Sequence, residues 1–282
     1  MNTRFLVRTT SVLLVVAILL CAGPALGGTI GQEGQEYVPP PVFGTNTQLI
    51  EQFGGSFFGV DVVGTKAYAC YGQRLAVLDV SNPATPTLLG RSAIMTGESV
   101  GIAVSGNYAY LASPGISVGS GNAGGMLRIL NISNPSNPIE VENLIPMFNS
   151  STPRDIALHG GYAYIADYSL WIVDISNPNS PSNVMDFWPD GMLVKRLTIA
   201  THPGNGKTYA YLAALNNKNL MTHAMKIVDL TNPAAPVVAG TFMLPDYAVD
   251  VAVQGTTATG SLHQLLPHAE TRSAKSVAAL PP

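Results

Sequence analysis

Short apolar runs recur along the chain, and each is closed by a turn-forming sequence. The clearest run reads Ile-Val-Asp-Ile-Ser-Asn-Pro at residues 172–178, and variants of it occupy residues 77–83, 129–135 and 227–233. β-Branched residues favour strands, and Asn-Pro ends them because proline fixes φ and restricts the residue before it. The pattern therefore predicts four strands that each run into a tight turn, and its recurrence indicates an internal repeat.

Three further strands accompany each copy of this phrase. A first apolar strand ends at glycine and a second carries a Tyr-Ala-Tyr type sequence, while a fourth follows the second proline of the turn. The first strands are expected at residues 61–64, 101–104, 155–158 and 250–253, and the second strands at 67–68, 108–110, 162–164 and 209–211. No long stretch has the 3.6-residue period of an amphipathic helix, which disfavours parallel βαβ folds.

Four short strands in each unit are typical of a propeller blade. The sequence thus predicts an all-β protein, a β-propeller of four-stranded blades that is incomplete, with about four full repeats and parts of a fifth. An all-β sandwich is the alternative, but it does not account for a near-identical phrase that occurs four times.

One polar residue recurs inside each repeated phrase, two positions before Ser or Thr. Asp and Asn side chains at such positions accept hydrogen bonds from the backbone of a following turn. An active site instead needs residues of different roles that converge. We therefore interpret these residues as structural turn caps: Asp79, Asn131, Asp174 and Asp229.

The units resemble LVIVD repeats. The signature is carried by residues 75–79, 127–131, 170–174 and 225–229, in register with the tyrosine strand and the Ser/Thr-Asn-Pro turn. The resemblance implies a secreted or surface-attached β-propeller of bacteria or archaea. It implies no particular activity and supplies no catalytic residues.

The remaining segments complete the predicted domain organisation. Residues 1–27 combine two arginines, an apolar run and a small-residue cleavage site, which indicates a secretory signal peptide. A disordered leader is expected at 28–45, the repeats at 46–255, and a non-repeat C-terminal tail at 256–282. The apolar run is too short for a bilayer span, so no transmembrane span is expected after cleavage. The predicted location is secreted, periplasmic or cell-surface.

The two ends of the repeat region are expected to meet in one blade. Residues 46–52 suit an outer strand of the blade whose inner strand is 250–254, and the two middle strands would then come from 256–282. That tail lacks the tyrosine and Leu-x-Ile-Val-Asp phrases of the other units. Open sheet edges would follow, so self-association is expected.

Composition and charge exclude some classes of function. The formal net charge is −3 and only 11% of residues are charged, so the chain lacks the basic surface of a nucleic-acid-binding protein. Cys21 falls in the predicted signal peptide, and the large Leu20 before it argues against lipidation. Cys70 is then the single mature cysteine, so stability must come from a packed core without an intrachain disulfide.

Two motif matches are interpreted as coincidental. Residues 115–119 match Gly-x-Ser-x-Gly around Ser117, but a nucleophile elbow needs a helix after the serine, and a Gly-rich segment follows here. Residues 119–124 match Gly-x-Gly-x-x-Gly without the strand and helix of a dinucleotide site. The histidines do not show zinc-helix spacing, and Trp171 and Trp188 are expected to pack between blades.

Three acids mark the best candidate site. Asp61, Asp155 and Asp250 are taken to occupy equivalent positions at the start of their first strands, which lie nearest a propeller's axis. Carboxylates gathered at one mouth of the channel would repel one another unless a cation or a donor such as Arg154 or Arg196 compensates. A divalent cation such as calcium, or a cationic ligand, is one expectation. The alternative is that each acid bonds backbone amides of the neighbouring blade.

Two main functions are compatible with these observations. The first is a non-enzymatic binding or scaffold module that presents propeller loops to an extracellular protein or glycan. The second is an extracytoplasmic hydrolase or lyase with a metal at the channel mouth, which rests on analogy of fold. A truncated gene product without independent function is a third hypothesis. The absence of a convergent polar set in the sequence favours the first.

Overall fold

The computed structural model describes residues 57–114, 117–118, 121–122, 125–141, 145–146, 152–216, 223–245, 247–255, 257–263 and 273–279. The predicted signal peptide, the leader and the expected outer strand at 46–52 lie outside these residues. No helix in the described part has the length and apolar character to cross a bilayer.

Four antiparallel sheets, here called blades 1 to 4, follow one another along the chain. Blade 1 contains β1 (Phe57–Val63), β2 (Lys66–Tyr71), β3 (Arg74–Asp79) and β4 (Thr87–Arg91). Blade 2 contains β5 (Gly101–Ser105), β6 (Tyr108–Ser113), β9 (Met126–Asn131) and β10 (Ile139–Glu140), and β11 (Ile145–Pro146) also pairs with β9. The short strands β7 (Ser117–Val118) and β8 (Gly121–Asn122) pair separately.

Blades 3 and 4 repeat the plan of blade 1. Blade 3 contains β12 (Asp155–His159), β13 (Tyr162–Ala166), β14 (Leu170–Asp174) and β15 (Ser182–Phe187). The 3-10 helix η1 (Pro189–Gly191) leads into blade 4, with β16 (Met192–Thr201), β17 (Thr208–Asn216), β18 (His223–Asp229) and β19 (Val237–Leu244). A fifth sheet contains β20 (Tyr247–Gln254), β21 (Thr257–His263) and β22 (Ser273–Ala279).

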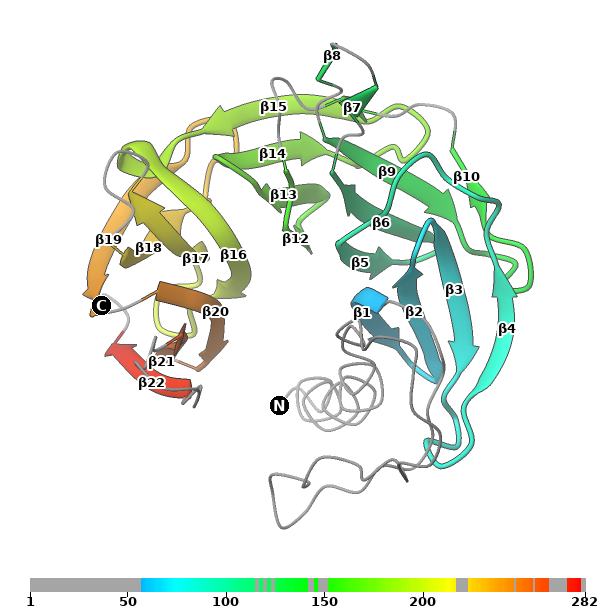
Figure 1. Cartoon of the computed structure of the whole chain (residues 1–282). Coiled ribbons are helices and arrows are strands. Elements are labelled where there is room, and N and C mark those ends of the chain that lie inside the picture. Colours follow the sequence, from blue (N-terminus) through cyan, green and yellow to red (C-terminus); the bar gives the residue numbers. More distant parts are fainter. Residues whose placement is uncertain are drawn as a thin grey trace, which may run out of the picture.

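The sheets are arranged along an arc, with their first strands on the inner side and their fourth strands outside (Figure 1). Each inner strand contacts the inner strand of the next sheet, in the order β1, β5, β12, β16 and β20. This arrangement confirms the predicted all-β, propeller-like fold of four-stranded blades with part of a fifth. Residues 257–263 and 273–279 of the predicted tail supply the second and third strands of the fifth sheet.

Each blade has two ends that differ in their connections. The first and third strands run toward tight turns, namely the Gly-containing hairpins and the Asn-Pro turns, and we call this the turn end. The second and fourth strands run toward the connections that include residues 167–169 and 188–191, and we call this the loop end. The two ends of each blade therefore differ in the segments that they expose.

The core lies between adjacent blades. In β3, for example, Leu75, Ala76, Val77 and Leu78 are all buried. A strand covered on both faces carries a continuous apolar run, whereas a strand with one wet face alternates. The outer strand β19 does alternate over most of its length. Trp171 is buried in the cluster between blades 2 and 3, as predicted, but the prediction for Trp188 is wrong because its side chain is 46% exposed.

Blades 1 and 2 approach closely at the outer rim. Gly90 of β4 faces the backbone of Ser136, which follows the Asn-Pro turn of blade 2, and a Cβ atom at Gly90 would collide with it. Gly240 occupies the same register position in blade 4, since Gly90 pairs with Val77 and Gly240 with Ile227. A Cβ at Gly240 would meet only the Ile227 side chain, at 3.5 Å. Only the first of these two glycines is required by packing.

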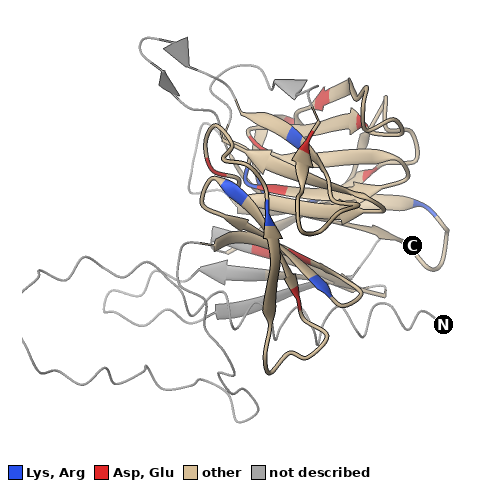
Figure 2. Ribbon diagram, turned by 90° about the vertical axis from the view of Figure 1, so that its right-hand side faces the viewer, with Lys and Arg blue, Asp and Glu red and all other residues tan. Residues whose placement is uncertain are grey.

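Charged residues are sparse and of mixed sign along the blades (Figure 2). Two cations are nevertheless buried at the same position of the third strand, Arg128 in β9 and Lys226 in β18. Lys226 binds Asp190 and lies 2.9 Å from Thr241 Oγ1. The pairing ties the η1 turn, in which Asp190 has a φ of 50°, to blade 4.

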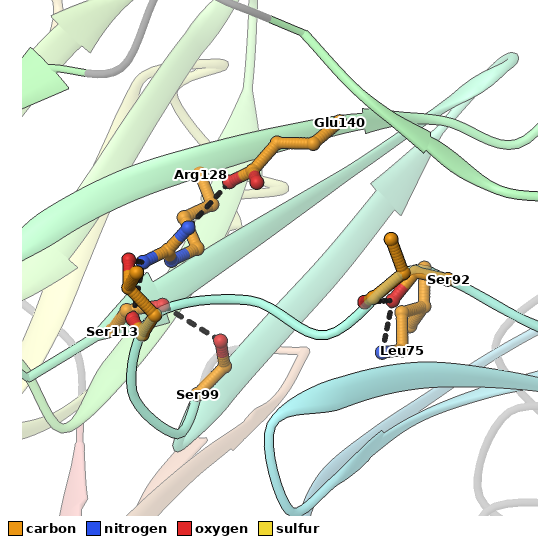
Figure 3. A network of polar contacts seen from close by, with 8 residues as sticks. Leu75, Ser92, Ser99, Ser113, Arg128 and Glu140 are labelled. Atoms are coloured by element: carbon orange, nitrogen blue, oxygen red, sulfur yellow. Dashed lines mark hydrogen bonds and ion pairs between the residues drawn. The ribbon is translucent and has the colours of Figure 1, made fainter.

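Arg128 of blade 2 binds both its own blade and the connection that leads into it (Figure 3). Its Nη1 donates to Glu140 Oε1 at 2.6 Å, and its Nη2 donates to the carbonyl and the hydroxyl oxygen of Thr96, in the connection after blade 1. Nearby, Ser99 and Ser113 share a hydrogen bond of 2.6 Å. A buried charge needs such partners because desolvation is costly. This network is therefore structural.

Candidate functional site

The four predicted turn caps lie at the ends of the third strands, and all have the same geometry. Each side-chain Oδ1 accepts a hydrogen bond from the backbone N–H two residues later, at 2.8–2.9 Å. In Asp79 and Asp174 the hydrogen bonds from the turn amide and the adjacent hydroxyl lower the carboxyl pKa, and desolvation opposes them. In Asp229 desolvation is the largest single effect and raises the pKa, but the hydrogen bonds together lower it. The four turn caps with this geometry are Asp79, Asn131, Asp174 and Asp229. The asparagine of each Asn-Pro pair accepts a second turn hydrogen bond, at 3.0–3.1 Å.

Asp61 and Asp155, two of the three candidate ligand residues, bond to the next blade. Asp61 Oδ2 accepts from the backbone N–H of Val104 at 2.8 Å, and Asp155 Oδ2 accepts from that of Leu197 at 3.0 Å. The other oxygen of each acid accepts from the amide of the following residue, at 2.8 and 3.0 Å. The contacts are those of the alternative interpretation, in which the acids join neighbouring blades.

The environment of Asp155 combines burial with nearby charges. Burial raises the pKa of its carboxyl to about 6, while the Leu197 amide and the Arg196 guanidinium oppose this rise and Asp250 adds to it. Arg196 is held in place because its Nη1 donates to the carbonyl oxygen of Arg154 at 2.6 Å. The Arg154 side chain is exposed. Of the two predicted donors, Arg154 and Arg196, it is Arg196 that acts electrostatically on the Asp155 carboxyl.

Strand register corrects the predicted equivalence of the three acids. Asp61 pairs with Tyr68 in blade 1, whereas the equivalent tyrosine of blade 3, Tyr164, pairs with Ala157. Asp155 lies two residues before Ala157. Asp61 is therefore two residues farther along its strand than Asp155. Relative to its own register position, each acid contacts the backbone N–H one position farther along the first strand of the next blade. The same kind of contact therefore occurs in both blades, but at different heights along the axis.

Asp250 does share the position of Asp155, five residues before the hairpin glycine. Its side chain is exposed, and Oδ1 accepts from the amide of Val251 at 2.8 Å. Within the described part of the chain, no three His, Cys, Asp or Glu side chains gather as a metal-binding group. Calcium binding remains a prediction.

A second polar cluster at the loop end was not predicted. Asp167 is buried in the connection between β13 and β14, and its backbone carbonyl accepts from the amide of Val194 at 3.1 Å. Its Oδ1 accepts from the amide of Thr152 at 2.9 Å. Burial lowers the pKa of Lys195, with Arg154 acting in the same direction and Asp167 against it. Lys195 lies at the irregularity between Val194 and Arg196, which sequence patterning does not reveal.

A concavity at the turn end lies between blades 2 and 3, and we call it the 2–3 groove. Its volume is about 620 Å³. Blade 2 contributes its first hairpin and the tyrosines of β6, and blade 3 contributes its first hairpin and its Asn-Pro turn. Tyr108 and Tyr162 are half-buried there, while Ser105, Asn107 and Ser176 are exposed.

An equivalent concavity, the 3–4 groove, lies one blade farther on. Its volume is about 360 Å³, and its lining comes from the first hairpins of blades 3 and 4 together with the second turn of blade 4. The lining residues of one groove correspond in strand register to those of the other. Ile175, Ser176 and Pro178 of the first groove match Leu230, Thr231 and Pro233 of the second. The repeat therefore produces two copies of one surface.

The blade 3 hairpin is a wall shared by the two grooves. His159, Gly160 and Tyr162 line both of them. His159 Nε2 lies 3.1 Å from Thr208 Oγ1 of blade 4, so the imidazole bridges the two blades at this wall. A ligand that fills one groove thus comes directly beside the other. Histidines were not expected to form a site, and only the repeated hairpin sequence could have suggested these grooves.

The two coincidental motif matches lie in a segment of which little is described. Ser117 begins β7 and Gly121 begins β8, so these residues form a short hairpin between β6 and β9. Their side chains lie outside the described structure. His202 lies at the turn between β16 and β17, where its Nδ1 accepts from the amides of Gly204 and Asn205 at 3.0 and 3.3 Å and so organises its own turn.

Comparison with known families identifies the class of protein. The LVIVD repeat model matches residues 54–93, 96–145, 152–187 and 206–244, which is more than half of the chain. The chain therefore belongs to the LVIVD repeat family, and the predicted resemblance is confirmed. A comparison with curated protein sequences gives no match.

A computationally designed protein of known structure shares the fold at low sequence identity. The computationally designed Ika8 protein is 8% identical, with a TM-score of 0.53 over 77% of this chain and 59% of that protein. Sqt1 of Saccharomyces cerevisiae is 9% identical, with a TM-score of 0.41 over 74% of this chain and 80% of that protein. The chain thus spans less than two thirds of the designed protein, and the likeness concerns the fold alone.

Proposed function

We propose that the chain is an exported, non-enzymatic binding or scaffold module that holds a partner at the cell surface through the turn end of its blades. The observation that carries this proposal is that one groove occurs twice, as the 2–3 and 3–4 grooves, with corresponding linings. Concave surfaces with aromatic side chains and a few polar groups are typical binding sites. A repeated surface suits binding, because catalysis needs different residues to converge at one point.

Two separate features support the proposed location. Residues 1–27 have the charged, apolar and small-residue regions of an export signal. The LVIVD family match supports the same location, as the resemblance implies surface-attached or secreted proteins. The polar residues first considered for a metal site, Asp61 and Asp155, are used in contacts between blades. This use favours a binding module over a metal-dependent hydrolase or lyase.

Export and envelope binding test the proposal together. The intact mass of the exported protein should correspond to a chain that starts at Gly28. The exported protein should also sediment with cell envelopes of the producing organism. Asn107→Trp should fill the 2–3 groove and reduce this sedimentation, because Asn107 is an exposed residue of its lining. Thr65→Trp is the matched control, since Thr65 has the same place in the blade 1 hairpin and lines neither groove.

Three outcomes would contradict the proposed function. They are a mature protein that retains residue 4, envelope binding that Asn107→Trp and Thr65→Trp leave equally strong, or chemical conversion of the bound material. Melting temperatures of both variants verify that each is folded. Because both tryptophans replace exposed hairpin residues, their stabilities should stay within about 0.5 kcal/mol of the parent protein.

A further inference from the structure

The lining of the 2–3 groove is polar but not charged. Among the described residues that line it, none is Asp, Glu, Lys or Arg. Burial raises the pKa of Tyr110 to about 12, so this hydroxyl stays protonated at ordinary pH. Among the described residues of the 3–4 groove the single such residue is Lys207, whose ammonium group already pairs with Asp229 at 2.9 Å. A charged ligand would find no complementary charge here.

The polar groups of the lining can both donate and accept hydrogen bonds. Ser105 and Ser176 carry hydroxyls, and Asn107 carries an amide. Such groups match a ligand whose own groups also act both ways. The half-buried rings of Tyr108 and Tyr162 add apolar surface beside a polar tip. Sugar rings have this combination of hydroxyl groups and apolar C–H faces.

The repetition of the grooves points to a ligand that also repeats. The two grooves share the His159–Tyr162 wall and present corresponding residues from successive blades. Their volumes, about 620 and 360 Å³, fall in the range of small-ligand sites. On the basis of the proposed function, we propose that the 2–3 and 3–4 grooves bind successive units of one uncharged linear polysaccharide.

A proline-rich peptide is the main competing occupant, because aromatic-lined grooves also bind such segments. Prolines offer carbonyl acceptors but lack N–H donors. They would therefore use only the donor half of the hydroxyl and amide groups in the lining. An extended peptide added to a sheet edge is disfavoured as well, because the hairpin strands at the shared wall, β12 and β13, already pair with each other.

Titration calorimetry on the full exported protein tests the proposal. The probes are the disaccharides and hexasaccharides of uncharged series: β-1,4-glucose, β-1,4-N-acetylglucosamine and β-1,4-mannose. At least one hexasaccharide should bind about tenfold or more tightly than its disaccharide, because linked units engage the second groove at high effective concentration. Asn107→Trp should remove this gain with length, while Thr65→Trp should preserve it.

Several results would overturn the inference. They are failure of every hexasaccharide to bind, tighter binding of a charged hexagalacturonate, or binding of decaproline that Asn107→Trp weakens. A length effect that Asn107→Trp leaves intact would place the sugars elsewhere and would equally overturn it. If envelope binding depends on the groove but no hexasaccharide binds, the proposed function stands and this inference fails. If envelope binding does not depend on the groove, the proposed function itself fails.

Discussion

Asp155 should make the stability of the protein depend on pH in a direction opposite to that of most carboxylates. Burial raises the pKa of its carboxyl from 3.8 to about 6 in the folded state. The folded protein then holds a proton that the unfolded chain has released, between about pH 4 and pH 6. Stability contributed by this group is therefore present below about pH 4 and lost as pH rises through 6.

The magnitude follows from the size of the shift. Roughly two pKa units correspond to at most about 3 kcal/mol. Asp155 is half-buried rather than fully enclosed, so solvent screening should reduce the effect to about 1–2 kcal/mol. Asp155→Asn resembles the protonated carboxyl and keeps an oxygen for the Leu197 amide. Its amide nitrogen replaces the oxygen that accepts from the Ile156 amide, so the change with pH is the quantity to compare. The stability of this variant relative to the parent protein should rise by about 1–2 kcal/mol between pH 4 and pH 7.

Urea unfolding at pH 4, 5, 6 and 7, followed by circular dichroism, measures this difference. Asp155→Ala should be less stable than Asp155→Asn by about 1–3 kcal/mol, because the backbone N–H of the buried residue Leu197 loses its side-chain acceptor. Asp250→Asn is the matched control at the equivalent, exposed position, with an expected change of about 0.5 kcal/mol or less. A difference between the parent protein and Asp155→Asn that stays constant from pH 4 to 7 would refute the reasoning.

Three further predictions concern packing and chemistry. Glu140→Gln should destabilise the protein by about 3 kcal/mol in thermal or urea unfolding, because it leaves the buried Arg128 without its carboxylate. Gly90→Ala should lower the melting temperature markedly through collision with the neighbouring backbone, whereas Gly240→Ala at the matching position should be tolerated; equal losses would contradict this packing argument. Ser117→Ala should leave labelling by a serine-reactive probe unchanged, and loss of labelling would instead favour a hydrolase.

Local chemistry explains why so much of the fold could be predicted. Turns such as Asp174-Ile-Ser-Asn-Pro are stabilised by contacts two residues away, so their geometry is contained within a few positions of the chain. Alternation and glycine placement similarly define the hairpins of the first and second strands. Four copies of these local signals predicted the order of strands within each blade and the number of full repeats.

The spacing between each acid and its hairpin glycine already distinguishes Asp61 from the other two acids. Asp155 and Asp250 lie five residues before their hairpin glycines, but Asp61 lies only three residues before Gly64. Because strand register is set by the hairpin turn, this difference of two residues moves Asp61 along the strand without changing its face. The sequence contained that distinction, although similarity of the flanking residues obscured it.

The sequence by itself determined the strands, their turns, the repeat and the family, because these depend on interactions between near neighbours. Only the tertiary structure decided that Asp155 bonds to Leu197 of the next blade and that Asp167 lies beside Lys195. It also decided that two hairpins and an Asn-Pro turn enclose each groove. These features depend on how twisted sheets stack along the arc, and no contact within a single repeat specifies that stacking.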